Sequence, residues 1–375
     1  MKPIEGVVLR DPDVNKSDIA SIVEKSLKGE KLNVDDIYAL LKSDELWVLG
    51  KVATTIKRVL HSDICTYIKN MILNYTNICI IKCKFCAFYR DINDGYTMSI
   101  EEAVKKVYAY WQKYGIRQVL IQGGVNPLLG IEYYEDLFKS IKRVTRNRVA
   151  IHALSPVEID YLSKKYKMSY RELLSRLKDS GMDSLPGGGA ELLIERVRRI
   201  LSPNKISTET WLRIVEEAHK LNIPTSVTMM YGHIETVYER AIHLYRLYEL
   251  NERVPGSLAF IAWNFEPNNT ELSREFEIKY PYGGYELLRI ISTARITFRE
   301  VIPNIQAGWL TVGERVAQLS FKFGANDWGG TLYEEKVIPS TGLRIQIPTT
   351  QRIENLIKEV GCTPKERDNW YRIVD

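Results

Sequence analysis

Short apolar runs alternate with longer amphipathic segments along most of this 375-residue chain. The runs have the length of buried strands, and the longer segments repeat apolar residues at the three- and four-residue spacing of helices. Strands are expected at 68–75, 118–122, 149–153, 184–185, 225–230, 259–263 and 305–309, with a weaker one near 325–327. Helices are expected between them at 100–114, 133–143, 170–180, 191–200, 208–221, 237–252, 285–300 and 311–323. This alternation predicts parallel β/α units.

Six to eight such units predict an α/β fold, a TIM-type (β/α) barrel that is closed or partly open. Residues 1–60 differ, because they read as three helices at 17–27, 33–42 and 44–60, with Asp and Asn residues placed as N-caps. We therefore expect an N-terminal helical segment (1–60) packed on a barrel (61–338). A C-terminal extension (339–375), which carries Pro348 and Pro364, is expected to pack outside the barrel.

Composition narrows the class of protein. Hydrophobic content of 45% and charged content of 26% are ordinary for a soluble globular chain. The 52 basic and 47 acidic residues are dispersed, so no nucleic-acid partner is expected. No apolar run approaches the ~20 residues that span a bilayer, and the first residues lack the apolar core of a signal peptide. The expectation is a cytoplasmic protein without membrane insertion.

Three cysteines carry the clearest chemical signal. Cys79, Cys83 and Cys86 have the spacing C-x3-C-x2-C, and Phe85 directly precedes the last one. Three thiolates so placed can ligate three irons of a four-iron cluster and leave the fourth iron open for chemistry. The main alternative is a structural zinc site, which needs four ligands. Cys65 or His61 can complete such a set, although neither has zinc-finger spacing.

This cysteine segment resembles the signature of radical S-adenosylmethionine (SAM) enzymes. The resemblance implies a [4Fe–4S] cluster on Cys79, Cys83 and Cys86, SAM on the open iron, and Phe85 in the cofactor site. It also implies an external electron donor such as flavodoxin or ferredoxin. The cofactors then supply the difficult chemistry, and the protein supplies position and shielding. A non-catalytic iron–sulfur or zinc protein is the alternative from another class.

Further candidates for cofactor binding follow the predicted strands, where barrel active sites lie. Gly123 and Gly124 follow the second strand and resemble the glycine-rich strand end that meets the amino group of SAM. Glu191 ends the loop Pro186-Gly-Gly-Gly-Ala-Glu191, where bare backbone can lie against a ligand and the carboxylate can accept from a ribose hydroxyl. An ordinary turn and a flexible connector are the plain alternatives.

Candidates for substrate contact and catalysis lie on other strand ends. His152 and Ser155 can hold polar groups of a substrate, and Trp263 and Trp309 can close the barrel mouth or simply pack in the core. The candidate proton acceptors are His233, Glu235 and Asp327. A loop histidine bonded to a carbonyl, or an aspartate capping a turn, is the structural alternative for these residues. His61, His219 and His243 are expected on helix surfaces and are assigned no role.

A closer resemblance covers residues 49–342 and points to radical SAM enzymes that act on futalosine derivatives in menaquinone biosynthesis. Its most specific stretches are residues 74–79, 121–125, 183–192 and 228–236. His152-Ala-Leu-Ser-Pro156 is similar to cyclic dehypoxanthinyl futalosine synthases, whereas aminofutalosine synthases usually have Lys-Ala-Tyr-Thr there. Deazaflavin (F420 precursor) synthases usually carry Pro-Gly-Thr-Ala-Ala-Glu where this chain has Pro186-Gly-Gly-Gly-Ala-Glu191.

The resemblance to the cyclases implies a small-molecule substrate, dehypoxanthinyl futalosine or a relative. A 5′-deoxyadenosyl radical takes the ribose C4′ hydrogen, and the sugar radical attacks the benzoate ring to form a spiro ring. Loss of an electron and a proton restores aromaticity, so a base must lie near the ring. Ala262-Trp-Asn-Phe-Glu-Pro267 departs from the usual Pro-Trp-Pro-Phe-Gln-Pro. The aminofutalosine and deazaflavin reactions therefore stay open as alternatives.

Overall fold

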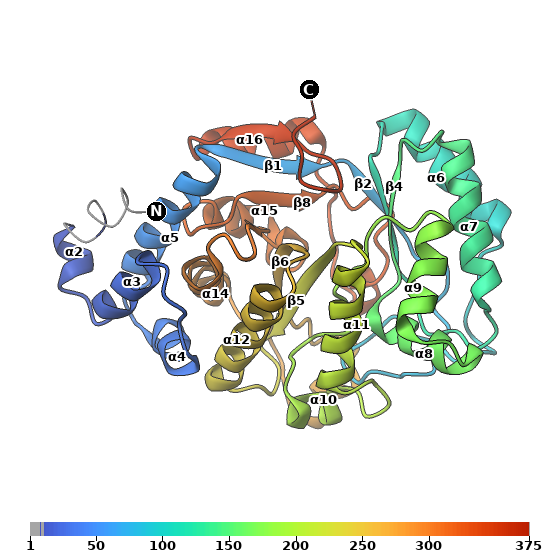
Figure 1. Ribbon diagram of the computed structural model, residues 1–375, viewed down its shortest axis with the longest axis horizontal. Helices are drawn as coiled ribbons and strands as arrows, with labels where there is room; N and C mark the ends of the chain where they lie inside the picture. Colours follow the sequence, from blue (N-terminus) through green and yellow to red (C-terminus); the bar gives the residue numbers. More distant parts are fainter. Residues whose placement is uncertain (1–7, 9–10, 375) are drawn as a thin grey trace.

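The computed structural model describes residues 8 and 11–374 and shows a barrel of parallel strands surrounded by helices (Figure 1). The strands are β1 (Ile64–Ile68), β2 (Asn70–Leu73), β3 (Gln118–Ile121), β4 (Ala150–Ala153), β5 (Thr225–Tyr231), β6 (Ser257–Asn264), β7 (Asn304–Ile305), β8 (Asp327–Gly330) and β9 (Thr363–Glu366). They form three parallel sheets, ordered β2-β3-β4, β5-β6-β7 and β8-β1-β9. The expected parallel pairing is confirmed.

Isolated parallel bridges join these sheets into a ring. His152 pairs with Ser184 and Leu185 with Thr225, so the two-residue stretch 184–185 links β4 to β5. Gln306 pairs with Asp327 and links β7 to β8, and β8 pairs with β1. The first strand is split at Lys69, because β1 faces β8 and β9 whereas β2 faces β3. Parallel pairing therefore runs round the whole barrel.

The barrel helices begin and end largely where capping residues place them. Their bounds are α6 (Ile100–Tyr114), α7 (Ile131–Val144), α8 (Pro156–Tyr166), α9 (Tyr170–Asp179), α10 (Glu195–Leu201), α11 (Thr208–Lys220), α12 (Val237–Arg253), α13 (Glu271–Glu275), α14 (Gly284–Phe298) and α15 (Trp309–Ser320). Ser99 and Glu102 form a capping box at the start of α6, and left-handed Gly115 ends it. This helix has the expected bounds.

Two helix expectations are corrected. Helix α8 was not expected, although Ser155 as N-cap followed by Pro156 is a recognised start signal. Helix α10 begins at Glu195 rather than at Glu191, because Glu191 has a positive φ of 40° and lies in the preceding loop. Both differences concern segments beside the candidate site.

The N-terminal segment is helical, as expected, and packs on the barrel's outer helices. It contains α2 (Pro12–Asn15), α3 (Ala20–Leu27), α4 (Val34–Lys42) and α5 (Leu46–His61). Helix α4 packs on α12 and α5 on α14, and the Ser26 hydroxyl donates to the Ile296 carbonyl at 2.7 Å. These helices form one end of the molecule, and α6 to α9 lie at the opposite end (Figure 1). The boundary at residue 60 stays a prediction.

The C-terminal segment enters the barrel instead of packing only outside it. After a 3₁₀ turn (Ile338–Thr341) and α16 (Thr350–Glu359), β9 pairs in parallel with β1. The residues after β9 reach the interior, where Arg367, Asn369 and Tyr371 line a cavity. The expectation is wrong here because Thr-Pro-Lys-Glu has no apolar strand pattern. Backbone pairing with β1 and ion pairs of Glu366 with Lys69 and Arg117 hold the strand in place.

Two of the histidines expected on helix surfaces are also buried. His243 is fully buried, where Leu193 N–H donates to its Nδ1 and its Nε2 donates to the Thr228 carbonyl. His219 Nε2 lies 2.9 Å from the Thr225 hydroxyl. Separately, none of the helices within residues 8 and 11–374 combines the length and apolarity of a membrane span.

Candidate active site

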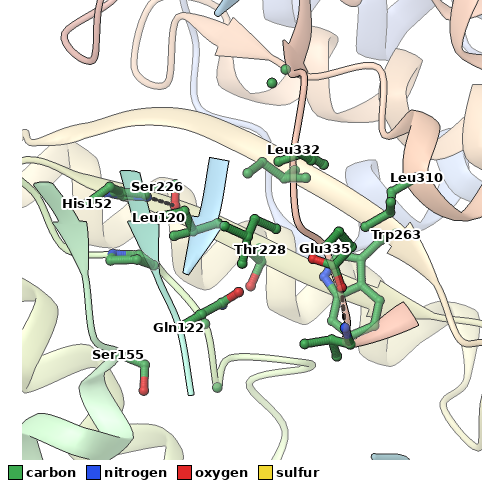
Figure 2. A pocket seen from close by; sticks show the side chains of 18 of the residues that line it. Leu120, Gln122, His152, Ser155, Ser226, Thr228, Trp263, Leu310, Leu332 and Glu335 are labelled. Carbon is green, nitrogen blue, oxygen red and sulfur yellow. Dashed lines mark hydrogen bonds between the residues drawn. The ribbon is translucent and has the colours of Figure 1, made fainter. Parts of the chain in front are cut away.

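The barrel encloses a cavity of about 430 Å³. The cysteine loop after β2 lines one part of it, and Arg367, Asn369 and Tyr371 from the C-terminal segment line another. Figure 2 shows His152 and Leu120 on one side and Trp263, Leu310 and Glu335 on the other. Gln122 and Thr228 lie between the two groups in this view. One cavity thus joins residues from most of the strands.

All three cysteines of the motif line this cavity. The loop that carries them is pinned by backbone hydrogen bonds from Ile80 to Val125 and from Lys84 to Leu201. Val125 N–H also donates to Cys79 Sγ at 3.3 Å. Burial raises the pKa of Cys83, and it raises the pKa of Cys86 to about 11. Bound metal ions are therefore needed to hold these groups as thiolates.

The donor set fits a multi-iron cluster better than a single ion. Three thiols facing a shared cavity, in an apolar surrounding of Ile81, Val125 and Val157, suit a larger cluster.

Gly123 and Gly124 allow the end of β3 to approach the cysteine loop. A Cβ on Gly124 would lie 2.2 Å from the Ile78 carbonyl oxygen and 2.6 Å from Cys79 Cβ. A Cβ on Gly123 would lie 2.7 Å from the Tyr75 ring. Both glycines line the cavity. Their lack of side chains is thus required by packing against the loop that holds the cysteines.

Glu191 lies near the cysteine loop in a buried ion pair that the sequence did not reveal. Its Oε1 is 3.0 Å from Lys205 Nζ, and both side chains line the cavity. Lys205 Nζ also stands 5.1 Å from the centre of the Phe85 ring. Lys205 was missed because it lies in the Pro203-Asn-Lys-Ile206 loop between two helices, far from any predicted strand end.

His152 and Ser155 both line the cavity, with hydrogen bonds already made. His152 Nδ1 is 2.7 Å from the Ser184 hydroxyl, and its Nε2 is 3.4 Å from that of Ser226. Burial, assisted by the charge of Arg367, lowers the pKa of His152 to about 3, so the ring is neutral. Ser155 caps α8 and donates to Glu158 Oε2 at 2.8 Å.

Glu158 is a cavity residue that the sequence did not suggest. It receives hydrogen bonds from the Tyr75 hydroxyl at 2.6 Å and from Ser155. Burial raises its pKa to about 7, so it can exchange a proton near neutral pH. The signal that would have revealed it is the Ser155-Pro-x-Glu158 helix start, which places a glutamate in the first turn.

The two candidate tryptophans are both in place around the cavity. Trp263 projects from β6 and is half-buried. Trp309 is nearly fully buried, donates from Nε1 to the Gly330 carbonyl at 3.0 Å, and stacks on Trp328 with ring centres 6.2 Å apart. Trp309 therefore serves core packing and the cavity wall together.

The three expected proton acceptors do not line the cavity within the described chain. His233 Nδ1 lies 3.0 Å from Glu235 Oε2, and Arg240 pairs with the same carboxylate at 2.6 Å. Burial opposes ionisation of Glu235, but the hydrogen bond to His233 and the charge of Arg240 lower its pKa to about 2. Asp327 accepts two hydrogen bonds from Arg367, at 2.6 and 2.9 Å. Glu235 with Arg240 and Asp327 with Arg367 form buried ion pairs, whereas the His233 ring bonds to backbone groups of Met230 and Ile234.

Comparison with known proteins identifies the family. The radical SAM superfamily model matches residues 73–247, and the CofH/MqnC C-terminal region model matches residues 254–375. The cyclic dehypoxanthine futalosine synthase of Halalkalibacterium halodurans is 35% identical over 359 residues, covering 95% of each chain. The 5-amino-6-(D-ribitylamino)uracil–L-tyrosine 4-hydroxyphenyl transferase of Methanocaldococcus jannaschii is 36% identical, covering 93% of this chain and 98% of the relative.

Solved structures share the fold. Methylornithine synthase (PylB) superposes with a TM-score of 0.69 at 18% identity, covering 92% of this chain and 97% of its own. The FeFe-hydrogenase maturase HydG of Carboxydothermus hydrogenoformans gives 0.72 at 16% identity, covering 99% and 86%. The chain belongs to the radical SAM superfamily, and within it to the CofH/MqnC family.

Membership confirms the fold and the class of chemistry expected from the cysteine motif. The protein is a radical SAM enzyme built on the barrel of that class, and its cofactors are a [4Fe–4S] cluster and SAM. The non-catalytic metal-binding alternative is therefore set aside. The roles of individual site residues stay predictions.

Proposed function

We propose that this enzyme cyclises dehypoxanthinyl futalosine to the cyclic product. The motifs from residue 152 to 191 favour this reaction, as does the 35% identity to a protein named cyclic dehypoxanthine futalosine synthase. A small-molecule substrate fits a cavity of about 430 Å³. An external one-electron donor, such as flavodoxin or ferredoxin, and a cytoplasmic location stay predictions.

One observation carries the choice among the sister reactions. Gly188 lines the cavity, where a Cβ would lie 3.5 Å from Gln122 Nε2 and 3.7 Å from Ser155 Cβ. Threonine, usual here in deazaflavin synthases, would add two heavy atoms beyond that Cβ and narrow the cavity. Gly189 has a φ of 77°, and a Cβ there would meet Val157 at 2.5 Å. This loop therefore supports a substrate different from that of the deazaflavin enzymes.

The part of the cavity beside the cysteine loop is assigned to the cofactors. Cys79, Cys83 and Cys86 hold the cluster, and the Gly123–Gly124 backbone leaves room for the amino-acid part of SAM. Lys205 and Glu191 offer one positive and one negative group to that zwitterion or to its ribose. When bound, the two cofactors supply a 5′-deoxyadenosyl radical.

The substrate end is walled by Trp263, Trp309 and the neutral His152. The indole rings orient an aromatic ring and exclude water, which shields a reactive intermediate. Glu158 is the acceptor proposed for the ring proton, because it lines the cavity and its pKa is about 7. Glu235 and Asp327 are not carried into this assignment because their carboxylates are paired with arginines. His233 is left out because its ring nitrogens bond to backbone groups.

A second candidate is transfer of the 4-hydroxyphenyl group of tyrosine to 5-amino-6-(D-ribitylamino)uracil. It is favoured by the relatives that carry this name, including the Methanocaldococcus jannaschii protein at 36% identity. Aminofutalosine synthesis has less support, because residues 152–156 depart from its usual pattern.

The test is an anaerobic assay of the reconstituted enzyme with dithionite, SAM and each substrate set in parallel. Mass spectrometry should detect 5′-deoxyadenosine together with a product two hydrogens lighter than dehypoxanthinyl futalosine. A hydroxyphenyl adduct of the ribitylaminouracil in its place would overturn the cyclase proposal. Gly188→Thr is expected to lower turnover of dehypoxanthinyl futalosine at least tenfold. Gly283→Ala, at a site with no atom within 4 Å of the added Cβ, is the control.

A further inference from the structure

A cluster of one lysine and two cysteines lies outside the cavity, where α5, β1 and the turn before β9 meet. Lys57 on α5, Cys65 on β1 and Cys362 are all buried, with exposed fractions of 1%, 0% and 7%. None of the three lines the active-site cavity. All five cysteines are free thiols in this structure.

Lys57 makes Cys362 unlike an ordinary buried cysteine. Lys57 Nζ lies 3.3 Å from Cys362 Sγ. Within the described part of the chain, the hydrogen bond of this amine goes to that sulfur. A buried cation without an anionic partner is costly, so the fold favours a thiolate at Cys362. The hydrogen bond from Cys65 and the charges of Lys57 and Lys322 lower the pKa of Cys362 to about 6, although burial opposes this.

Cys65 is placed to act as the resolving thiol. It is hydrogen-bonded to Cys362, and its own pKa is raised by that bond and by burial. Cys65 on β1 pairs in register with Pro364 on β9, and Cys362 stands two residues before that partner, directly ahead of the strand. Arg295 faces Cys65 from α14, and His61, beside Lys57, has a pKa lowered to about 4 by burial. A low-pKa thiolate beside a second thiol is the arrangement of redox-active cysteines.

We propose that Cys65 and Cys362 form a redox-active dithiol, activated by Lys57, that small disulfides oxidise reversibly to an intramolecular disulfide. The Cys362 thiolate attacks one sulfur of the small disulfide and expels one thiolate, which takes up a proton. The Cys65 sulfur then attacks Cys362 in the mixed disulfide, its proton passes to the second leaving thiolate, and the second small thiol departs. Two protein thiols lose two electrons and two protons, and the small disulfide gains both as two thiols.

A disulfide between Cys65 and Cys362 would link β1 covalently to the C-terminal segment that lines one part of the cavity. β9 and the residues that follow carry Arg367, Asn369 and Tyr371, and β1 is their partner strand. A covalent link at Cys362 should restrict opening of this segment. Amide hydrogen exchange over residues 363–374 is therefore expected to slow on oxidation.

The direct test is anaerobic equilibration of the holoenzyme in cystamine/cysteamine buffers, followed by an acid quench with N-ethylmaleimide and trypsin. Cleavage yields residues 59–69 with Cys65 and residues 359–365 with Cys362, and neither peptide contains a cluster cysteine. The expected result is a cross-linked pair two hydrogens lighter than the two peptides, reversed by dithiothreitol. Separately alkylated or cysteamine-modified peptides at every buffer ratio would overturn the proposal. Cys65→Ser should accumulate cysteamine on Cys362.

The role of Lys57 is tested by the pH profile of iodoacetamide alkylation at Cys362. The midpoint is expected near pH 6 in the wild type and at least one pH unit higher in Lys57→Met. Lys51→Met, a change at an exposed lysine of the same helix, is the control and should leave the midpoint unchanged. If Lys57→Met does not fold, a wild-type midpoint at the ordinary value of about 8.5 by itself overturns the activation by Lys57.

Discussion

Gly124 shows how one residue can decide whether the cluster binds. Because an added Cβ would lie 2.2 Å from a backbone carbonyl, Gly124→Ala must displace the loop that carries Cys79. We expect less than half of the wild-type iron and acid-labile sulfide per chain after reconstitution. Gly283→Ala should keep full cluster content, since nothing lies within 4 Å of its new Cβ. Full iron in the Gly124→Ala protein would show that the loop tolerates this shift.

Glu158 should control how both activity and stability depend on pH. Its folded-state pKa of about 7 lies above the ordinary value of 4.5, so its contribution to stability is present below pH 4.5 and is lost as the pH rises through 7. In Glu158→Gln the unfolding free energy relative to wild type should rise by about 2–3 kcal/mol between pH 5 and pH 8. Urea unfolding at both values measures this.

The same substitution tests the proposed proton transfer. The rise of kcat/KM through about pH 7 should disappear in Glu158→Gln, and kcat should fall about a hundredfold. Glu235→Gln is the comparison, because Glu235 lies outside the cavity and should change stability more than the pH profile. An unchanged profile in Glu158→Gln would remove this residue as the acceptor.

Among the elements, the C-terminal segment depends on one buried ion pair. Arg367, which follows β9, makes two hydrogen bonds to the fully buried Asp327 of β8. Arg367→Met leaves that carboxylate without its cation and should cost about 3–5 kcal/mol in urea unfolding. Adding Asp327→Asn should recover part of the loss. Arg372→Met, which breaks an exposed pair with Asp368, should cost less than about 1 kcal/mol.

The apolar periodicity of the sequence predicted some helices and strands accurately and missed others. Helix α6 has its expected bounds, because apolar spacing and both caps agree locally. The stretch 184–185 and strand β7 pair over only two residues each, and β9 has no apolar pattern at all. Such short or polar strands form because neighbouring strands offer unpaired backbone N–H and C=O groups. The residues of the short strand itself therefore do not predict it.

For the molecule as a whole, closure of the barrel should determine how well the radical is contained. Trp263 walls the cavity, so Trp263→Ala should admit water and uncouple SAM cleavage from product formation. The ratio of 5′-deoxyadenosine to product is expected to rise at least threefold. Trp47→Ala, which removes a largely exposed ring on α5, should leave that ratio unchanged. An unchanged ratio in Trp263→Ala would show that other groups exclude the solvent.

The sequence by itself determined the radical SAM class and the parallel barrel, and it predicted Cys79, Cys83 and Cys86 as the cluster ligands. The cysteine motif depends on spacing within a few residues, and each strand or helix of the barrel depends on a local apolar period, so both are readable from neighbouring residues. Only the tertiary structure decided that Glu158, Lys205 and Arg367 line the cavity, and that Glu235 and Asp327 are paired with arginines outside it. The role of a charged side chain depends on burial and on partners such as Tyr75 for Glu158 and Asp327 for Arg367, and only folding brings these together.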